Sequence, residues 1–159
     1  MTETRWLSDQ EQQSWRAFID GCRALFDVLD RQLQADSNLP HAYFEILIPL
    51  SEVPDRTLRM SELAERARSS RSRLSHAVAR LEERGWVRRT DCPTDKRGQL
   101  AELTDEGFAV VQAAAPGHVE AVRTYLIDQL SPEQIRVLGD VGDIMLRTTA
   151  ETDLPPRRN

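Results

Sequence analysis

The hydrophobic positions of this 159-residue chain form long helical stripes near both ends, with shorter elements between them. From about Ser8 to Ala35, apolar residues recur every three or four positions, which is the spacing of an amphipathic helix. A last helix is predicted to run to about Thr149, because Ser131-Pro-Glu-Gln134 combines a capping Ser with a Pro in the first turn. Most of the first stripe is expected to be core, although so long a helix also offers a subunit-contact surface. That stripe comprises Trp15, Phe18, Ile19, Cys22, Leu25, Phe26, Leu29 and Leu33.

The middle of the chain is divided into short helices by turn residues. A turn at 36–40 precedes an apolar helix from His41 to Leu50, which Pro49 is expected to end or bend. Ser61 is placed to cap a helix from Met60 to about Arg68. Ser69-Ser70 then offers a cap for a helix from Arg71 to Arg84, and Gly85 marks its end.

Two helices joined by a short polar turn indicate a helix-turn-helix, and the residues after them extend that motif. Trp86 to Asp91 has strand character, the segment from Cys92 to Gly98 has turn chemistry, and Gln99 to Leu103 alternates like a returning strand. The pattern therefore predicts a β-wing. Thr104 opens a long helical stretch to about Leu130, interrupted at Pro116-Gly117. The predicted fold class is mainly α with a small β-wing.

Charge is segregated along the chain. From Arg56 to Gly98 there are twelve Lys or Arg residues and six acids, so this segment carries +6. The whole chain carries −5, and the remainder therefore carries −11. A basic segment on an acidic scaffold is typical of a nucleic-acid-binding module, whereas the alternative is a solvated, Arg-rich surface.

The second helix of the motif has a polar outer face. Ser72, Ser75, His76 and Ala79 lie opposite the apolar line of Leu74, Val78 and Leu81, so the helix could enter a major groove. Arg71 and Arg73 lie near its start, and Arg80 on a flank is placed as a phosphate clamp. A solvated helix face is the alternative. The candidate DNA contacts are Ser70, Arg71, Ser72, Arg73, Ser75, His76, Arg80, Lys96 and Arg97.

The wing contains a charge pair two residues apart. Asp95 can brace the guanidinium of Arg97 and hold it extended at the tip. A braced Arg of this kind can read a narrow minor groove. The alternative is an ordinary charged hairpin.

Other classes of protein find little support in the sequence. No apolar run approaches the roughly 18 residues that span a bilayer, and the first residues lack a signal-peptide pattern, so we expect a cytoplasmic protein without a membrane partner. There is no nucleophile elbow, phosphate-binding Gly-rich loop or metal-ligand cluster, so we expect no enzyme, no cofactor and no metal.

The run from Leu58 to Gly107 resembles the winged-helix core of MarR-type transcriptional regulators. The resemblance lies in LRMSELAERARSSRSRLSHAVARLEERGWVRR and in the wing DKRGQLAELTDEG. The flanking helices match too, so the likeness covers about Trp6 to Thr149. It implies a homodimer whose first and last two helices intertwine, and whose two lobes bind a pseudo-palindromic operator in double-stranded DNA. Such proteins are usually repressors.

The resemblance also implies relief of repression by a small-molecule effector, often an aromatic carboxylate, bound between the dimer helices and the winged lobe. In this chain that crevice would draw on Trp15, Arg16, Arg23, His41 and Tyr43, although Trp15 and Tyr43 also suit a core. The implied organisation is a dimerisation helix (1–39), a DNA-binding lobe (40–107), C-terminal dimerisation helices (108–150) and a disordered tail (151–159).

Two alternatives to an effector-controlled DNA reader stay open. A winged helix can bind protein instead of DNA, since fold alone does not fix function. A thiol switch is the other. Cys22 on the first apolar stripe is expected to be buried and inert, and Cys92 in the wing is expected to be exposed.

Overall fold

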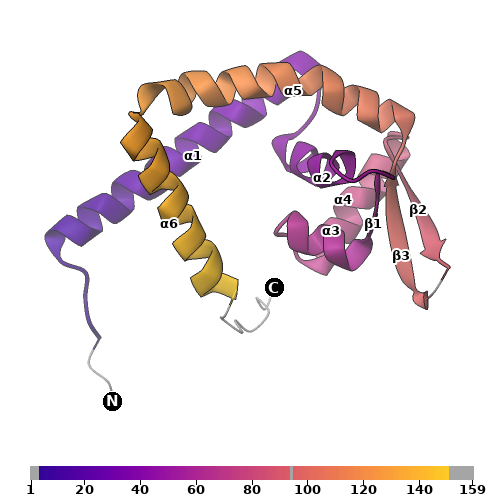
Figure 1. Cartoon of the computed structure of the whole chain (residues 1–159), viewed down its shortest axis with the longest axis horizontal. Coiled ribbons are helices and arrows are strands. Elements are labelled where there is room, and N and C mark those ends of the chain that lie inside the picture. The colour runs from indigo at the N-terminus through magenta and orange to yellow at the C-terminus, as the bar shows by residue number, and fades with distance from the viewer. Residues whose placement is uncertain (1–3, 94, 151–159) are drawn as a thin grey trace. The chain divides into compact units, whose positions relative to one another are not determined.

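A computed structural model describes residues 4–93 and 95–150 of the protein, with only the backbone of Lys96, Arg97 and Ala150. The chain forms two units, the first through Ala121 and the second from Val122 (Figure 1). The first unit contains α1 (Asp9–Ser37), α2 (His41–Ser51), β1 (Thr57–Arg59), α3 (Met60–Arg66), α4 (Arg71–Glu83), β2 (Val87–Cys92), β3 (Asp95–Leu103) and most of α5 (Asp105–Tyr125). The second contains the 3-10 turn η1 (Ile127–Gln129) and α6 (Pro132–Ala150). The predicted fold class is confirmed.

Helix α1 begins at a capping box and ends at a left-handed residue. The backbone N–H of Ser8 donates to Glu11 at 2.7 Å, and the N–H of Glu11 donates to the Ser8 hydroxyl at 3.3 Å. At the other end Asn38 adopts φ 48° and its N–H bonds to the carbonyl of Gln34. The carboxylate of Asp30 then accepts a hydrogen bond from the N–H of His41 at 2.8 Å. Since Pro40 provides no side-chain cap for α2, Asp30 supplies one and fixes α2 to α1.

The core of the first unit is formed by the helix-turn-helix and the elements that pack against it. Only Leu29 and Leu33 of α1 are buried, whereas Trp15 and Phe26 are 53% and 51% exposed. The expectation that most of the α1 stripe is core is therefore wrong for a single chain, because the first half of α1 lies outside the core cluster. The largest fully buried side chains are Leu33, Leu39, Leu47, Leu50, Leu63, Leu74, Val78 and Leu81.

The helix-turn-helix matches the prediction at α4 and departs from it at α3. Ser70 caps α4, accepting a hydrogen bond from the N–H of Arg73 at 3.3 Å. Gly85 follows with φ 74°, as the predicted helix end requires. Helix α3, however, has Arg59 at its N-cap position and ends at Arg66. Ser61 is already inside the helix, so the predicted Ser61 cap is wrong.

The wing belongs to a three-stranded antiparallel sheet of order β1-β3-β2. The short strand β1 was not predicted; it pairs with β3, with Thr57 opposite Glu102. Strand β3 already begins at Asp95, which lies opposite Cys92, so the predicted turn from 92 to 98 is largely strand. Cys92 is only 6% exposed, which corrects the prediction of an exposed thiol. Gly98 lies close to it, since a Cβ atom added at Gly98 would come within 3.3 Å of the Cys92 Cβ.

Helices α2 and α5 continue past an internal proline. Helix α2 runs two residues beyond Pro49, and α5 runs through Pro116 to Tyr125, so the predicted interruption at Pro116-Gly117 is wrong. Burial on both sides, by Val111 and Ala114 before Pro116 and by Ala121 after it, offsets the lost backbone hydrogen bond.

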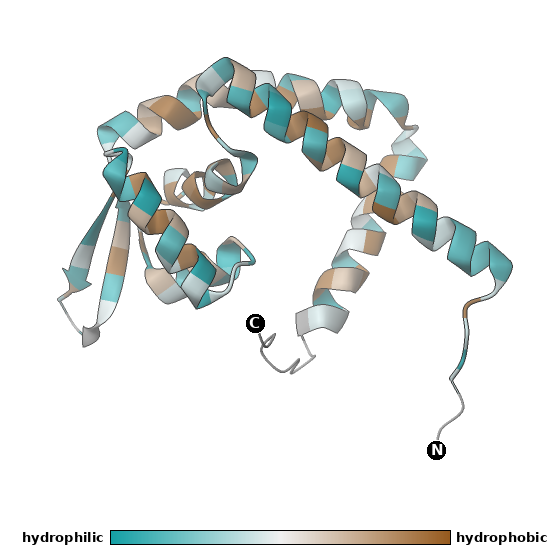
Figure 2. Ribbon diagram, turned by 180° about the vertical axis from the view of Figure 1, so that it is seen from behind, coloured by the Kyte–Doolittle hydropathy of each residue, from teal (hydrophilic) through white to brown (hydrophobic). Residues whose placement is uncertain are grey.

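Helix α6 starts as predicted and is unburied. The N–H of Ser131 donates to the Gln134 side chain at 2.8 Å, and the N–H of Gln134 donates to the Ser131 hydroxyl at 3.2 Å. Figure 2 shows apolar and polar residues alternating along α1 and α6. From Pro132 to Thr149 no residue of the single chain is buried. The apolar stripe of α6 therefore lacks a covering partner within the described chain.

The segment predicted as a tail, 151–159, lies outside the described residues. Among the helices that are described, none is long and apolar enough to cross a bilayer.

Candidate nucleic-acid interface

Helix α4 presents the predicted polar face to solvent. Leu74, Val78 and Leu81 are buried on one side. Ala79 is half-buried, whereas the remaining predicted contact residues of this segment are exposed. These exposed residues are Ser70, Arg71, Ser72, Arg73, Ser75, His76 and Arg80.

Positive charge is least compensated at the start of α4. Within the described part of the chain, neither Arg71 nor Arg73 takes part in an ion pair. Arg80, by contrast, lies 2.8 Å from the carboxylate of Glu83, and this hydrogen bond raises the pKa of Arg80. The N-terminal end of α4 is therefore the stronger attractor of phosphate, and Arg80 would have to leave Glu83 to contribute fully.

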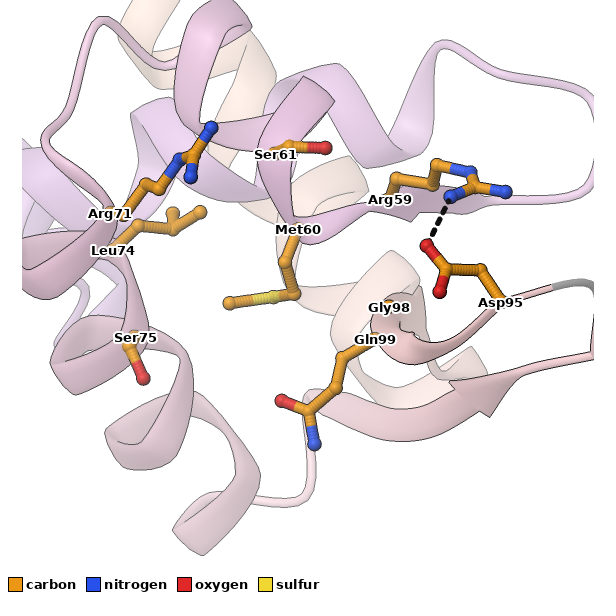
Figure 3. A pocket seen from close by; sticks show the side chains of 9 residues that line it. All are labelled: Arg59, Met60, Ser61, Arg71, Leu74, Ser75, Asp95, Gly98 and Gln99. Atoms are coloured by element: carbon orange, nitrogen blue, oxygen red, sulfur yellow. Dashed lines mark ion pairs between the residues drawn. The ribbon is translucent and has the colours of Figure 1, made fainter.

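A groove of about 380 Å³ separates the start of α4 from the wing. Figure 3 shows Arg71 and Ser75 of α4 on one side, Asp95 and Gln99 of β3 on the other, and Met60 between them. The groove is therefore lined by Arg71, which forms no ion pair among the described residues, and by hydrogen-bonding side chains such as those of Ser75 and Gln99.

Asp95 contacts an arginine that the sequence did not single out. Its carboxylate lies 3.6 Å from the guanidinium of Arg59, the last residue of β1 and the N-cap of α3 (Figure 3). Arg59 was missed because β1 is needed to place it opposite the wing. The predicted brace of Arg97 by Asp95, and the predicted DNA contacts of Lys96 and Arg97, involve side chains outside the described residues.

The five candidate effector residues do not converge within one chain. Trp15, Arg16 and Arg23 lie on the exposed face of α1, before its buried residues. His41 lines a cavity of about 760 Å³, whereas Tyr43 lines a separate hollow beside α4. Tyr43 is half-buried, and Trp15 is not core in the single chain.

The larger cavity contains a histidine that the sequence analysis did not consider. His118 of α5 packs against Phe44 at 4.8 Å and against His41 at 5.7 Å between ring centroids. Burial, and secondarily the charge of His41, lowers the pKa of His118. Its Nδ1 is buried and makes no hydrogen bond. A polar atom in this state is available to a ligand that reaches the cavity. The cavity is lined by His41, Phe44, Glu45, Ile48, Pro49, Glu52, Arg66, Ala67, Arg68 and His118.

Both cysteines are free thiols of limited exposure. Cys22 is half-buried on α1, so the predicted burial is only partial, and Cys92 is buried in the hairpin. Within the described residues, no three His, Cys, Asp or Glu side chains are grouped so that they could hold a metal ion.

Comparison with known proteins identifies the family. A model of the MarR family matches residues 37–98. The crystal structure of Sco3205, a MarR family transcriptional regulator from Streptomyces coelicolor solved in complex with DNA, is 52% identical over 97% of both chains, with a TM-score of 0.92. The chain belongs to the MarR family of transcriptional regulators.

Two further relatives support this assignment. The MarR family regulator AbsC from Streptomyces coelicolor is 38% identical, with a TM-score of 0.89 over 94% of this chain and all of AbsC. The transcriptional repressor YetL from Bacillus subtilis is 31% identical over 67% of this chain, and the match spans 66% of YetL. The predicted family is therefore confirmed. A regulator family also agrees with the expectation that this MarR-family protein is not an enzyme.

Proposed function

We propose that this MarR-family protein is a sequence-specific DNA-binding repressor that acts as a homodimer on a pseudo-palindromic operator. The observation that carries the proposal is the exposed polar face of α4, with Arg71 and Arg73 in no ion pair among the described residues. Small polar side chains there permit close approach to base edges, and the arginines supply attraction to phosphate. DNA in the Sco3205 crystal and the repressor YetL support the same reading. The division into dimerisation helices around a DNA-binding lobe of residues 40–107 belongs to this proposal.

The dimer is supported by the apolar residues that a single chain leaves uncovered. Trp15 and Phe26 of α1 are about half exposed, and α6 exposes Ile144 to 51%. Apolar side chains exposed side by side on a helix are typical of protein–protein contacts. Sedimentation should therefore give twice the chain mass of 18.1 kDa. A monomer at micromolar concentration would contradict the proposed dimer. It would not bear on the proposed role of α4 in DNA binding.

Selection of bound duplexes from a random pool, at two salt concentrations, tests the DNA reader. We expect enrichment of a palindrome whose half-sites lie about one helical turn apart. If no sequence is enriched and binding disappears at moderate salt, the basic lobe supplies only non-specific attraction. The protein-binding alternative would then be favoured.

The effector belongs in the cavity beside His118. Its walls combine apolar surface from Phe44 and Ile48 with the cationic side chains of Arg66 and Arg68, and the carboxylates of Glu45 and Glu52 also line it. The apolar surface suits the ring of an aromatic carboxylic acid, and the two arginines suit its carboxylate. Benzoic and 4-hydroxybenzoic acids are therefore suitable probes. An acid that binds should raise the unfolding temperature and release operator DNA.

Ile48→Trp is a matched test because it fills the cavity without altering α4. In that variant the acid should neither stabilise the protein nor release DNA, while operator affinity stays unchanged. If release by the acid persists in Ile48→Trp, the effector binds elsewhere.

A thiol switch is the weaker alternative, because Cys22 is half-buried and Cys92 is buried. Reduced protein and peroxide-treated protein should therefore bind operator with equal affinity.

A further inference from the structure

Arg84 connects the end of α4 to the end of α1. It is the C-cap residue of α4, and its Nη1 donates a hydrogen bond to the carbonyl of Asn38 at 3.0 Å. Asn38 is the left-handed C-cap of α1. The last carbonyls of a helix lack partners within that helix, and a cation near them also complements the helix dipole. Arg84 therefore stabilises the end of a helix that lies 46 residues earlier in the chain.

Two aromatic rings from other elements lie beside the same guanidinium. Its Cζ is 4.8 Å from the ring centroid of Trp86, which precedes β2, and 5.7 Å from that of Tyr43 in α2. Both distances are within the range of cation–π attraction. One side chain thus contacts α1, α2 and the segment leading into the wing.

The partners of Arg84 are themselves held in place. The carboxylate of Asp30 fixes the start of α2 to α1 through the N–H of His41. Leu39, between Asn38 and α2, is completely buried in the core. The end of α1 and the start of α2 are therefore held together, and Arg84 contacts both from the end of α4.

We propose that Arg84 is a positioning residue that sets the direction of α4 relative to α1, and thereby the half-site spacing that the dimer accepts. This inference rests on the proposed function as a dimeric DNA reader. In such a dimer α1 contributes to the subunit contact and α4 enters the groove, so the angle between them determines the separation of the two reading helices. A planar guanidinium defines this angle because it must satisfy a carbonyl and two rings at once.

The experiment uses the operator obtained by selection, together with versions lengthened or shortened by one or two base pairs between the half-sites. Affinity is measured for the full-length protein, for Arg84→Ala and for Arg84→Gln, and each protein is also titrated with a single half-site. Circular dichroism checks that each variant is folded. Arg88→Ala is the matched control, because Arg88 is also an exposed arginine of this basic lobe but pairs with Glu102 of the neighbouring strand.

We expect the parent protein to prefer one half-site spacing. In both Arg84 variants the ratio of affinities for the preferred and the altered spacings should fall about tenfold, while affinity for a single half-site changes less than twofold. Arg88→Ala should keep the parent's preference. The inference is wrong if a folded Arg84 variant keeps the parent's spacing profile, or if Arg88→Ala flattens it equally. If the parent protein binds no palindromic site, the proposed function itself fails.

Discussion

Among the glycines, Gly107 is the one where an added Cβ atom would come closest to another segment. A Cβ atom there would lie 2.1 Å from the carbonyl oxygen of Trp86, which is backbone and cannot rotate away. The N–H of Gly107 donates to the Thr104 hydroxyl at 3.0 Å, and that hydroxyl donates to the carbonyl of Gly85 at 2.7 Å. The start of α5 is therefore packed directly against the end of the helix-turn-helix.

Gly107→Ala should destabilise the protein by about 1–3 kcal/mol or more, as overpacking does. The measurement is urea unfolding followed by circular dichroism. Gly21→Ala is the control, since a Cβ there meets nothing within 4 Å of the single chain. That substitution should be neutral or stabilise by up to about 1 kcal/mol. Equal effects of the two substitutions would contradict the close packing at Gly107.

His118 makes stability depend on pH. Burial lowers its pKa from the usual 6.5, so the folded state favours the neutral ring. His41, whose Nδ1 lies 3.9 Å from Glu45, faces it across the cavity that Glu45, Glu52, Arg66 and Arg68 also line. As pH falls through about 6.5, the unfolded chain takes up a proton before the folded one does, so this contribution is present above that pH and is lost below it.

The urea midpoint should therefore fall between pH 7.5 and pH 5.5, and His118→Gln should reduce that dependence. His76→Gln serves as the control because His76 is exposed on α4. An unchanged pH dependence in His118→Gln would assign the effect to other groups.

We propose that Arg73 contacts a base near the entry of α4. Unlike Arg80, it forms no ion pair among the described residues. Arg73→Ala should cost about 1–3 kcal/mol of operator affinity and relax the preference at one base position, as loss of a bidentate base contact does. Competition binding against single-base operator variants measures both effects. A uniform loss across all sequences would make Arg73 a phosphate contact instead.

At the scale of elements, the wing is a paired ribbon rather than a loop. Strand β3 begins at Asp95, so position 97 lies in a strand whose partner ends at Cys92. A cation at the tip of such a ribbon can enter a narrow minor groove. Arg97→Ala should therefore weaken operators with A·T-rich flanks more than operators with G·C-rich flanks, as measured by fluorescence anisotropy. Unchanged affinity for both would remove the wing from the DNA interface.

The elements predicted correctly are those whose determinants are local. Ser70 and Gly85 bracket α4 with a cap and a left-handed residue, and Ser131 with Gln134 starts α6. The elements that were missed or misplaced depend on tertiary contacts. Strand β1 has three residues and exists only by pairing with β3. Pro116 signals a break, yet burial on both sides keeps α5 continuous.

The candidate site, too, was predicted correctly where its determinants are local and missed where they depend on tertiary contacts. Periodicity is sufficient to predict which face of α4 is exposed, because the buried line of Leu74, Val78 and Leu81 fixes the rotation of the helix. The pairing of Asp95 with Arg59, and the contact of Arg84 with Asn38, join residues 36 and 46 positions apart. No local pattern encodes such contacts, so they require the assembled lobe.

At the scale of the whole molecule, α6 provides the sharpest test of the dimer. Its apolar stripe includes Leu138, which is 38% exposed in the single chain, and Arg136 lies on the opposite side of the helix. An aspartate at position 138 would place a charge in the centre of the proposed subunit contact, where desolvation makes it costly. Leu138→Asp should therefore convert the dimer to a monomer in sedimentation experiments.

Loss of the dimer should also weaken binding to the palindromic operator by about a hundredfold or more, because the second half-site then no longer binds at high effective concentration. Binding to a single half-site should be nearly unchanged, since α4 is intact. Arg136→Asp introduces the same side chain on the polar side of α6 and should leave both sedimentation and operator affinity as they are. A Leu138→Asp protein that remains dimeric would show that the α6 stripe is covered by something other than a second copy of the chain.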